Sequence, residues 1–136
     1  MNKSIFNNSS NLDRHQSLFA VMLLSRIDLI TRWRCGSTAF FQRAETDGLL
    51  VSRRNTGRVG YRWEDVWTFE GGLPPQELED EYRADLITPD ELAEVCPLKA
   101  KTLIRKAAAG EIPHRRIGRF IRFVPAEAAA WLRNWS

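Results

Sequence analysis

The chain has 136 residues, 43% of them hydrophobic and 27% charged, a balance typical of a soluble globular protein with one core or two very small ones. Its longest apolar run, Leu18 to Leu24, is much shorter than the roughly 20 residues that span a bilayer, and no strongly basic segment precedes it as in an export signal. We therefore expect a cytoplasmic protein, and its net charge of +3 by itself says little about partners.

The chain opens with residues 1–10, which are rich in Asn and Ser. They offer few groups to bury, so we predict a flexible tail over residues 1–17. The apolar residues 18–24 then begin the first folded unit, which we place at residues 18–69. Covering this unit is the expected role of the apolar run, and a dimer contact is the alternative.

Two helices are predicted in the first unit. Ser25 is a hydroxyl N-cap with Asp28 three residues later, which is the signature of a helix start. A second helix is expected over residues 37–47, where Gly48 supplies the residue type that a left-handed C-terminal cap favours. A short helix that contains Phe69 closes the unit.

Between the second helix and the closing helix, the arginines of residues 53–58 surround Gly57. This pattern predicts a basic hairpin. The return strand is expected over Tyr61-Arg62-Trp63, with the two aromatic residues facing inward and the arginine outward.

Residues 70–85 combine a Gly-Gly pair and a Pro-Pro pair with six acidic residues and one arginine. This composition predicts an acidic linker, with one short helix after Pro75. A solvated spacer is the favoured interpretation. The alternative is a segment that mimics DNA and shields a basic hairpin.

The segment that follows, residues 86–136, repeats the same order of signals. Thr88 with Glu91 predicts the first helix, residues 99–109 the second, and Gly110 its end. Arg115 to Arg119 form a second basic hairpin, with a return strand expected over Ile121-Arg122-Phe123 and Arg122 facing outward. A closing helix carries Trp131. This order predicts a mainly α protein with small β-hairpin wings, in the form of two tandem winged helix-turn-helix domains.

The second helix of such a pair is a rod of the width that the major groove of DNA accepts, and the wing can reach a neighbouring groove or its phosphates. Arginine and lysine suit both contacts. In the first unit the candidate DNA-binding residues are Thr38, Gln42, Arg43, Arg53, Arg54 and Arg58. In the second unit they are Lys99, Lys101, Thr102, Arg105, Lys106, Arg115, Arg116 and Arg119, whereas Leu103 and Ala107 are expected to face the core.

The second unit resembles the excisionase-type branch of the MerR-like winged helix-turn-helix proteins. The resemblance rests on five stretches: Thr88 to Ala93, Thr102 to Arg105, Gly110 to Pro113, Arg116 to Arg119 and Ala128 to Leu132. It implies binding to double-stranded DNA by a nucleoid-associated protein that acts in excision of a mobile element or in transcription. An integrase or the transcription machinery would then be a partner, and self-association is a further possibility.

Catalysis is not expected, because neither His15 nor His114 has an acid or a nucleophile at a recognisable spacing. Cys35 and Cys96 lack the paired spacing of a zinc site or a disulfide framework, so we expect free thiols, no metal and no cofactor. The rival hypothesis is a protein-interaction module, in which aromatic residues of the first unit (Phe40, Phe41, Trp63 and Trp67) bind another protein. Phe40 is favoured as a core residue over a contact with a thymine methyl.

Overall fold

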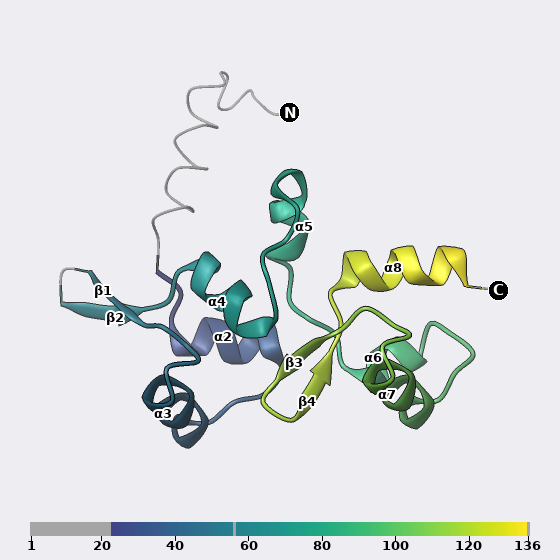
Figure 1. The fold of residues 1–136 in the computed structure, drawn as a ribbon, viewed down its shortest axis with the longest axis horizontal. Helices are drawn as coiled ribbons and strands as arrows, with labels where there is room; N and C mark the ends of the chain where they lie inside the picture. The colour runs from purple at the N-terminus through teal and green to yellow at the C-terminus, as the bar shows by residue number, and fades with distance from the viewer. Residues whose placement is uncertain (1–22, 56, 136) are drawn as a thin grey trace.

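A computed structural model describes residues 23–55 and 57–135 (Figure 1). The predicted tail over residues 1–17 and most of the apolar run 18–24 lie outside this part. None of the helices in the described ranges has the length and apolar character needed to cross a membrane.

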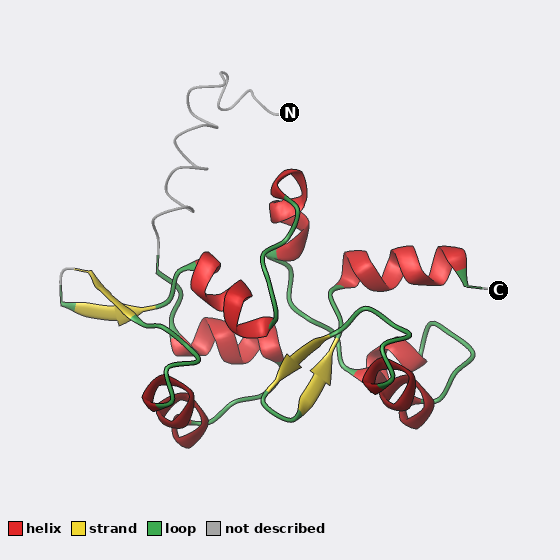
Figure 2. Cartoon of the chain, viewed as in Figure 1, coloured by secondary structure: helices red, strands yellow, loops and turns green. Residues whose placement is uncertain are grey.

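The described chain repeats one order of elements, helix, helix, hairpin, helix, in its two halves (Figure 2). The first half consists of α2 (Arg26–Trp33), α3 (Thr38–Thr46), β1 (Arg53–Asn55), β2 (Arg58–Gly60) and α4 (Trp63–Glu70). The second half consists of α6 (Pro89–Ala93), α7 (Ala100–Ala108), β3 (Arg115–Ile117), β4 (Phe120–Arg122) and α8 (Pro125–Asn134). The short helices η1 (Gln76–Leu78) and α5 (Glu79–Tyr82) lie between the halves.

The predicted helix starts are confirmed by two reciprocal capping boxes. In the first, the Asp28 N–H donates to Ser25 Oγ at 3.0 Å and the Ser25 N–H donates to Asp28 Oδ2 at 2.8 Å. Thr88 and Glu91 repeat this exchange at 3.1 and 2.9 Å. Each box satisfies two backbone donors that a helix start leaves without intrahelical partners.

The glycine stops are confirmed as well. Gly48 and Gly110 follow α3 and α7 with φ of 75° and 81°, a conformation in which a Cβ atom would be strained. The chain therefore leaves both helices in the same way and turns toward the hairpin.

A further feature is common to both halves. The residue just before each capping box pairs with a residue just after the hairpin: Leu24 exchanges two backbone hydrogen bonds with Tyr61, and Ile87 exchanges two with Phe123, all between 2.7 and 2.9 Å. These bridges fasten the start of each unit to the end of its hairpin.

The return strand predicted over Tyr61-Arg62-Trp63 is wrong. The strand that pairs with β1 is β2, in the register Arg53 opposite Gly60. Arg62 is instead the N-cap of α4, and Glu64 and Asp65 occupy its first turn, where the positive end of the helix dipole favours acids. The acidic residues at the start of α4 therefore favour a helix here over the strand that the alternating apolar residues predicted.

The second return strand is displaced by one residue from the prediction, since β4 ends at Arg122 and pairs Arg116 with Ile121. The predicted outward Arg122 is also wrong, because its side chain is buried. Its Nε donates to the carbonyl oxygen of Trp33 at 2.9 Å and its Nη2 to that of Arg34 at 3.3 Å. Its Nη1 donates to the carbonyl oxygen of the preceding residue, Ile121. Three backbone carbonyl oxygens thus accept hydrogen bonds from this buried cation.

The β3–β4 hairpin contributes to two hydrophobic cores. Ile117 and Val124 pack into the core of the first half, together with Trp33 and Phe41. Ile121 lies in the second core, which surrounds α7. Since the side chains of a strand alternate between two faces, a hairpin can seal a core on each side. The β3–β4 hairpin therefore lies between the two cores and packs against both.

The solvated-spacer interpretation of residues 70–85 is wrong for Glu70 and Tyr82, both of which are buried. Arg32 donates two hydrogen bonds of 2.8 Å to the Glu70 carboxylate and one of 2.6 Å to the carbonyl oxygen of Ala84. The Nε1 of Trp33 donates to the same carboxylate at 2.5 Å. The predicted short helix after Pro75 is present as η1 and α5. The segment thus covers the first core rather than only joining two domains.

The Arg32–Glu70 pair generates a stability prediction. Glu70→Gln leaves the Arg32 guanidinium buried without its counter-charge, and we expect the free energy of unfolding to fall by about 3–5 kcal/mol. Urea denaturation followed by tryptophan fluorescence measures the change. The matched control is Glu111→Gln, which removes the exposed 3.2 Å pair with Lys106 and should cost less than about 1 kcal/mol. Equal losses in the two variants would contradict the assignment.

Candidate nucleic-acid interface

Helix α7 presents a basic face to solvent. Leu103 and Ala107 are fully buried, as predicted, and hold the helix against the second core, where Leu92 of α6 also lies. Lys101 and Arg105 are four residues apart on the opposite side and are exposed. Neither has an ion-pair partner among the residues that the structure describes.

The other candidates of this helix differ in their exposure. Lys99 is the exposed N-cap residue of α7, whereas Thr102 is half-buried. Lys106 is half-buried and forms an ion pair with Glu111 at 3.2 Å. Lys106 therefore has part of its charge compensated within the protein, and Lys101 and Arg105 are the more available cations.

Ile104 of α7 was not among the predicted site residues. It is 43% exposed and stands between Leu103 and Arg105 in the sequence. An apolar side chain on the outer side of a groove-binding helix can contact the methyl group of thymine. The sequence carries no clear signal for this exposure, because a helical projection places Ile104 at the margin of the core face that Leu103 and Ala107 define.

The second wing carries Arg116 and Arg119, both exposed, at the end of the β3–β4 hairpin. Arg119 has its guanidinium carbon 5.3 Å from the ring centre of Phe120, a cation–π contact that holds it over the turn. The two arginines flank Gly118, whose φ of 63° makes the tight turn.

Arg115, predicted as a third residue of this wing, points toward the protein. Its side chain is 16% exposed and its Nη2 lies 3.1 Å from Oε2 of Glu127. The same carboxylate oxygen accepts a 2.8 Å hydrogen bond from the Tyr82 hydroxyl. Arg115 thus joins the hairpin to α8 and α5, and its charge is neutralised there.

Helix α3 of the first half is held by the buried Phe41 and Ala44. The candidates Thr38, Gln42 and Arg43 are all exposed. Phe40 is half-buried and lies edge-to-face with Trp33, at 6.1 Å between ring centres. Its packing against the core cluster agrees with the interpretation of Phe40 as a core residue.

The acids at the end of α3 have different environments. Glu45 is half-buried, lies 3.3 Å from Nη2 of Arg26 and accepts a hydrogen bond from the Tyr61 hydroxyl. Asp47 is exposed and has no ion-pair partner in the described chain. Only Asp47 therefore presents an uncompensated negative charge beside the candidate residues of this helix.

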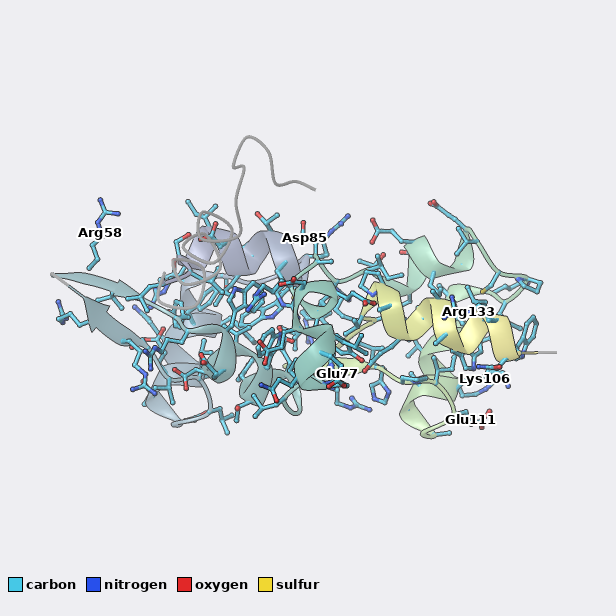
Figure 3. The ribbon with its side chains drawn as sticks, turned by 90° about the horizontal axis from the view of Figure 1, so that it is seen from above. Arg58, Glu77, Asp85, Lys106, Glu111 and Arg133 are labelled. Carbon is cyan, nitrogen blue, oxygen red and sulfur yellow. The ribbon has the colours of Figure 1, made fainter. Side chains whose placement is uncertain are left out.

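The first wing, β1–β2, projects from one end of the molecule, and Arg58 points away from the body (Figure 3). Arg54 and Arg58 are exposed. Arg53 lies 3.0 Å from Oδ2 of Asp65, which anchors the base of the hairpin to α4. Two of the three arginines predicted in this wing are thus unpaired within the described residues.

The candidate elements are arranged along one edge of the molecule. Helices α3 and α7 lie at the lower edge in Figure 1, with the turn of the β3–β4 hairpin between them. Helices α5 and α8 lie toward the opposite edge. Most of the candidate side chains therefore come from elements of the lower edge or from the projecting first wing.

Comparison with known proteins agrees with this geometry for the second half of the chain. Residues 86–136 match the family model described as a helix-turn-helix domain. No curated protein and no solved structure matches the chain. The C-terminal part of the chain is thus similar to a helix-turn-helix domain, and α6 and α7 are the two successive helices at its start. Domains of this class bind DNA through the second helix.

The Tyr82 site generates a titration prediction. Burial, together with the hydrogen bond to Glu127, raises the pKa of Tyr82 to about 12, and burial also raises the pKa of Tyr61. These are the two tyrosines of the chain. At pH 10, where an ordinary tyrosine is half ionised, we expect little tyrosinate absorbance at 295 nm.

The raised pKa of Tyr82 also determines how the free energy of unfolding changes with pH. Because the folded pKa of Tyr82 lies above the unfolded value of 10.0, its contribution is complete below pH 10 and is lost as the pH rises toward about 12. Tyr82→Phe should remove this alkaline component of the unfolding free energy, and circular dichroism checks that the fold persists during the titration. A two-tyrosine transition centred at pH 10 in the folded protein would contradict the assignment.

Proposed function

We propose that this chain is a non-enzymatic protein that binds double-stranded DNA, with α7 in the major groove and the β3–β4 wing on an adjacent groove or its phosphates. The observation that carries the proposal is the exposed basic face of α7, with Lys101 and Arg105 unpaired within the described residues. It lies on the second helix of the matched helix-turn-helix domain.

The first half is proposed to be a diverged second copy of this winged unit, with α3 as its groove-binding helix. The shared order of elements supports this, as do the paired capping boxes. The two backbone bridges at equivalent places, Leu24 with Tyr61 and Ile87 with Phe123, add to the support. Thr38, Gln42 and Arg43 would face the groove, and Arg54 and Arg58 of the first wing would contact phosphates.

Within this function we propose a transcription regulator or an excisionase-like directionality factor of the MerR-like type, acting at the nucleoid. The sequence resemblance of residues 86–136 supports this narrower assignment. An integrase or the transcription machinery is the corresponding protein partner. An excision reaction with purified integrase distinguishes the two roles, since only a directionality factor changes its outcome.

The rival hypothesis, protein binding by aromatic residues of the first unit, has less support. Phe41 is fully buried and Trp67 is 3% exposed. Trp63 stacks on Trp67 with ring centres 5.3 Å apart. Phe41 and Trp67 stabilise the first core and offer little surface to a partner, whereas Phe40 and Trp63 are half-buried and pack against that core.

The DNA-binding proposal predicts the effect of Arg105→Ala. Loss of a groove-facing cation should raise Kd for duplex DNA by about five- to a hundredfold, equivalent to about 1–3 kcal/mol, without lowering the unfolding temperature. Fluorescence anisotropy with a labelled 40-base-pair random duplex measures it. The control is Arg133→Ala, which removes an exposed arginine of α8 (Figure 3) and should leave Kd nearly unchanged. Failure of the unmodified chain to bind the duplex at low salt would refute the proposal.

A further inference from the structure

A groove lies between the two halves of the molecule, on the edge that carries the candidate residues. One wall is α3 of the first half, and the other is the turn of the β3–β4 hairpin of the second half. Its volume is about 1070 Å³. The lining residues used below are Phe40, Arg43, Asp47, Arg116, Arg119 and Phe120.

The two walls are held in a fixed relation. A Cβ atom added to Gly118 would lie 2.9 Å from Cε1 of Phe40, so the hairpin turn sits directly against α3. Ile117, the residue before the turn, is buried in the same core as Phe41 of α3. Buried contacts on both sides of Gly118 thus keep the groove from opening by a simple swing of the hairpin.

The groove is net positive, with three arginines and one acid among its described lining residues; the hairpin wall has two unpaired cations, and on the α3 wall Arg43 stands with Asp47. Arg43 comes from the first half, and Arg116 and Arg119 from the second. None of the three forms an ion pair with a described residue, and all are exposed. Asp47 is the single acid among the described residues that line the groove.

Arginines on opposite walls with an open channel between them suit an extended anion better than a single small one. The sugar–phosphate backbone of DNA has one negative charge per nucleotide, and arginine donors that face it contribute affinity and position the duplex. The aromatic rings of Phe40 and Phe120, which also line the groove, add apolar surface that can contact deoxyribose rings. The groove therefore matches a DNA strand in charge.

We propose that this groove binds one stretch of DNA backbone, with Arg43 of the first unit and Arg119 of the second contacting the same strand segment. The two units then occupy one continuous DNA site instead of two independent half-sites. The inference rests on the proposed DNA-binding function and extends it to a composite site that neither half contains alone.

A thermodynamic cycle tests the shared strand. On the full chain with the 40-base-pair duplex, we expect Arg43→Ala and Arg119→Ala each to raise Kd by about three- to tenfold and to lower the salt slope by about one. The double variant should lose less than the product of the two single effects, because a strand released from one wall also loses contact with the other. The control cycle, Arg58→Ala with Arg119→Ala, joins residues of different wings and should be multiplicative.

Asp47 provides a test of opposite sign. Asp47→Asn removes the negative charge from the groove without shortening the side chain, and we expect it to lower Kd by about threefold through reduced repulsion of the phosphates. The matched control is Glu77→Gln, an exposed acid of η1 on the side of α5 (Figures 1 and 3). Its Kd should equal that of the unmodified chain.

The outcomes separate this inference from the broader proposal. Absence of duplex binding by the unmodified chain overturns both. Binding that depends on Arg105 but is unchanged in Arg43→Ala and in Asp47→Asn overturns the composite groove and the DNA contact assigned to Arg43, while DNA binding by α7 stands. Multiplicative effects in the Arg43–Arg119 cycle also overturn the shared strand segment.

Discussion

The end of α2 is the junction on which the rest of the structure depends. Arg32, Trp33 and Arg34 each reach a different part of the chain. Arg32 neutralises Glu70 of α4 and bonds to Ala84, and its own carbonyl accepts the N–H of Leu86.

The carbonyls of Trp33 and Arg34 accept hydrogen bonds from Arg122, and Arg34 pairs with Glu91 at 2.7 Å. Charged donors bonded to buried carbonyls are costly to separate, so this junction fixes the two halves as one body.

This fixation makes the two wings physically unequal. The β1–β2 hairpin projects from the end of the molecule (Figure 1), whereas β3–β4 has buried side chains on both faces, Ile117 toward one core and Ile121 toward the other. A projecting hairpin can adjust to a ligand, since few packed contacts restrain it. A hairpin enclosed by two cores presents its turn in a set position. The arginines of the second wing are therefore preorganised relative to α3 and α7.

Most features with a local cause were predicted from the sequence, the return strand over Tyr61-Arg62-Trp63 excepted, and features with a distant cause were missed. The helix caps and stops act within a few residues of their own position, so they could be predicted from the sequence and are confirmed: Ser25, Thr88, Gly48 and Gly110. The outward orientation expected for Arg122 was wrong, because its acceptors lie 88 and 89 residues away in the sequence. Arg115 was missed at a shorter range, since its carboxylate partner Glu127 is 12 residues away on α8 and lies beyond the local hairpin pattern. The composite groove was missed because its walls belong to different halves. The DNA contacts assigned to the candidate residues remain predictions.

The β3–β4 hairpin also makes the segment that matches the family model different from the segment that can fold on its own. Residues 86–136 match one family model, but Ile117 and Val124 of that segment are buried against residues of the first half. Excised at its family boundaries, the segment would expose this apolar face and lose the acceptors of Arg122. The first half, cut off alone, would lack the hairpin that closes its core. Each half therefore depends on the other to close its core, and neither is expected to fold fully when cut at the boundary of residue 86.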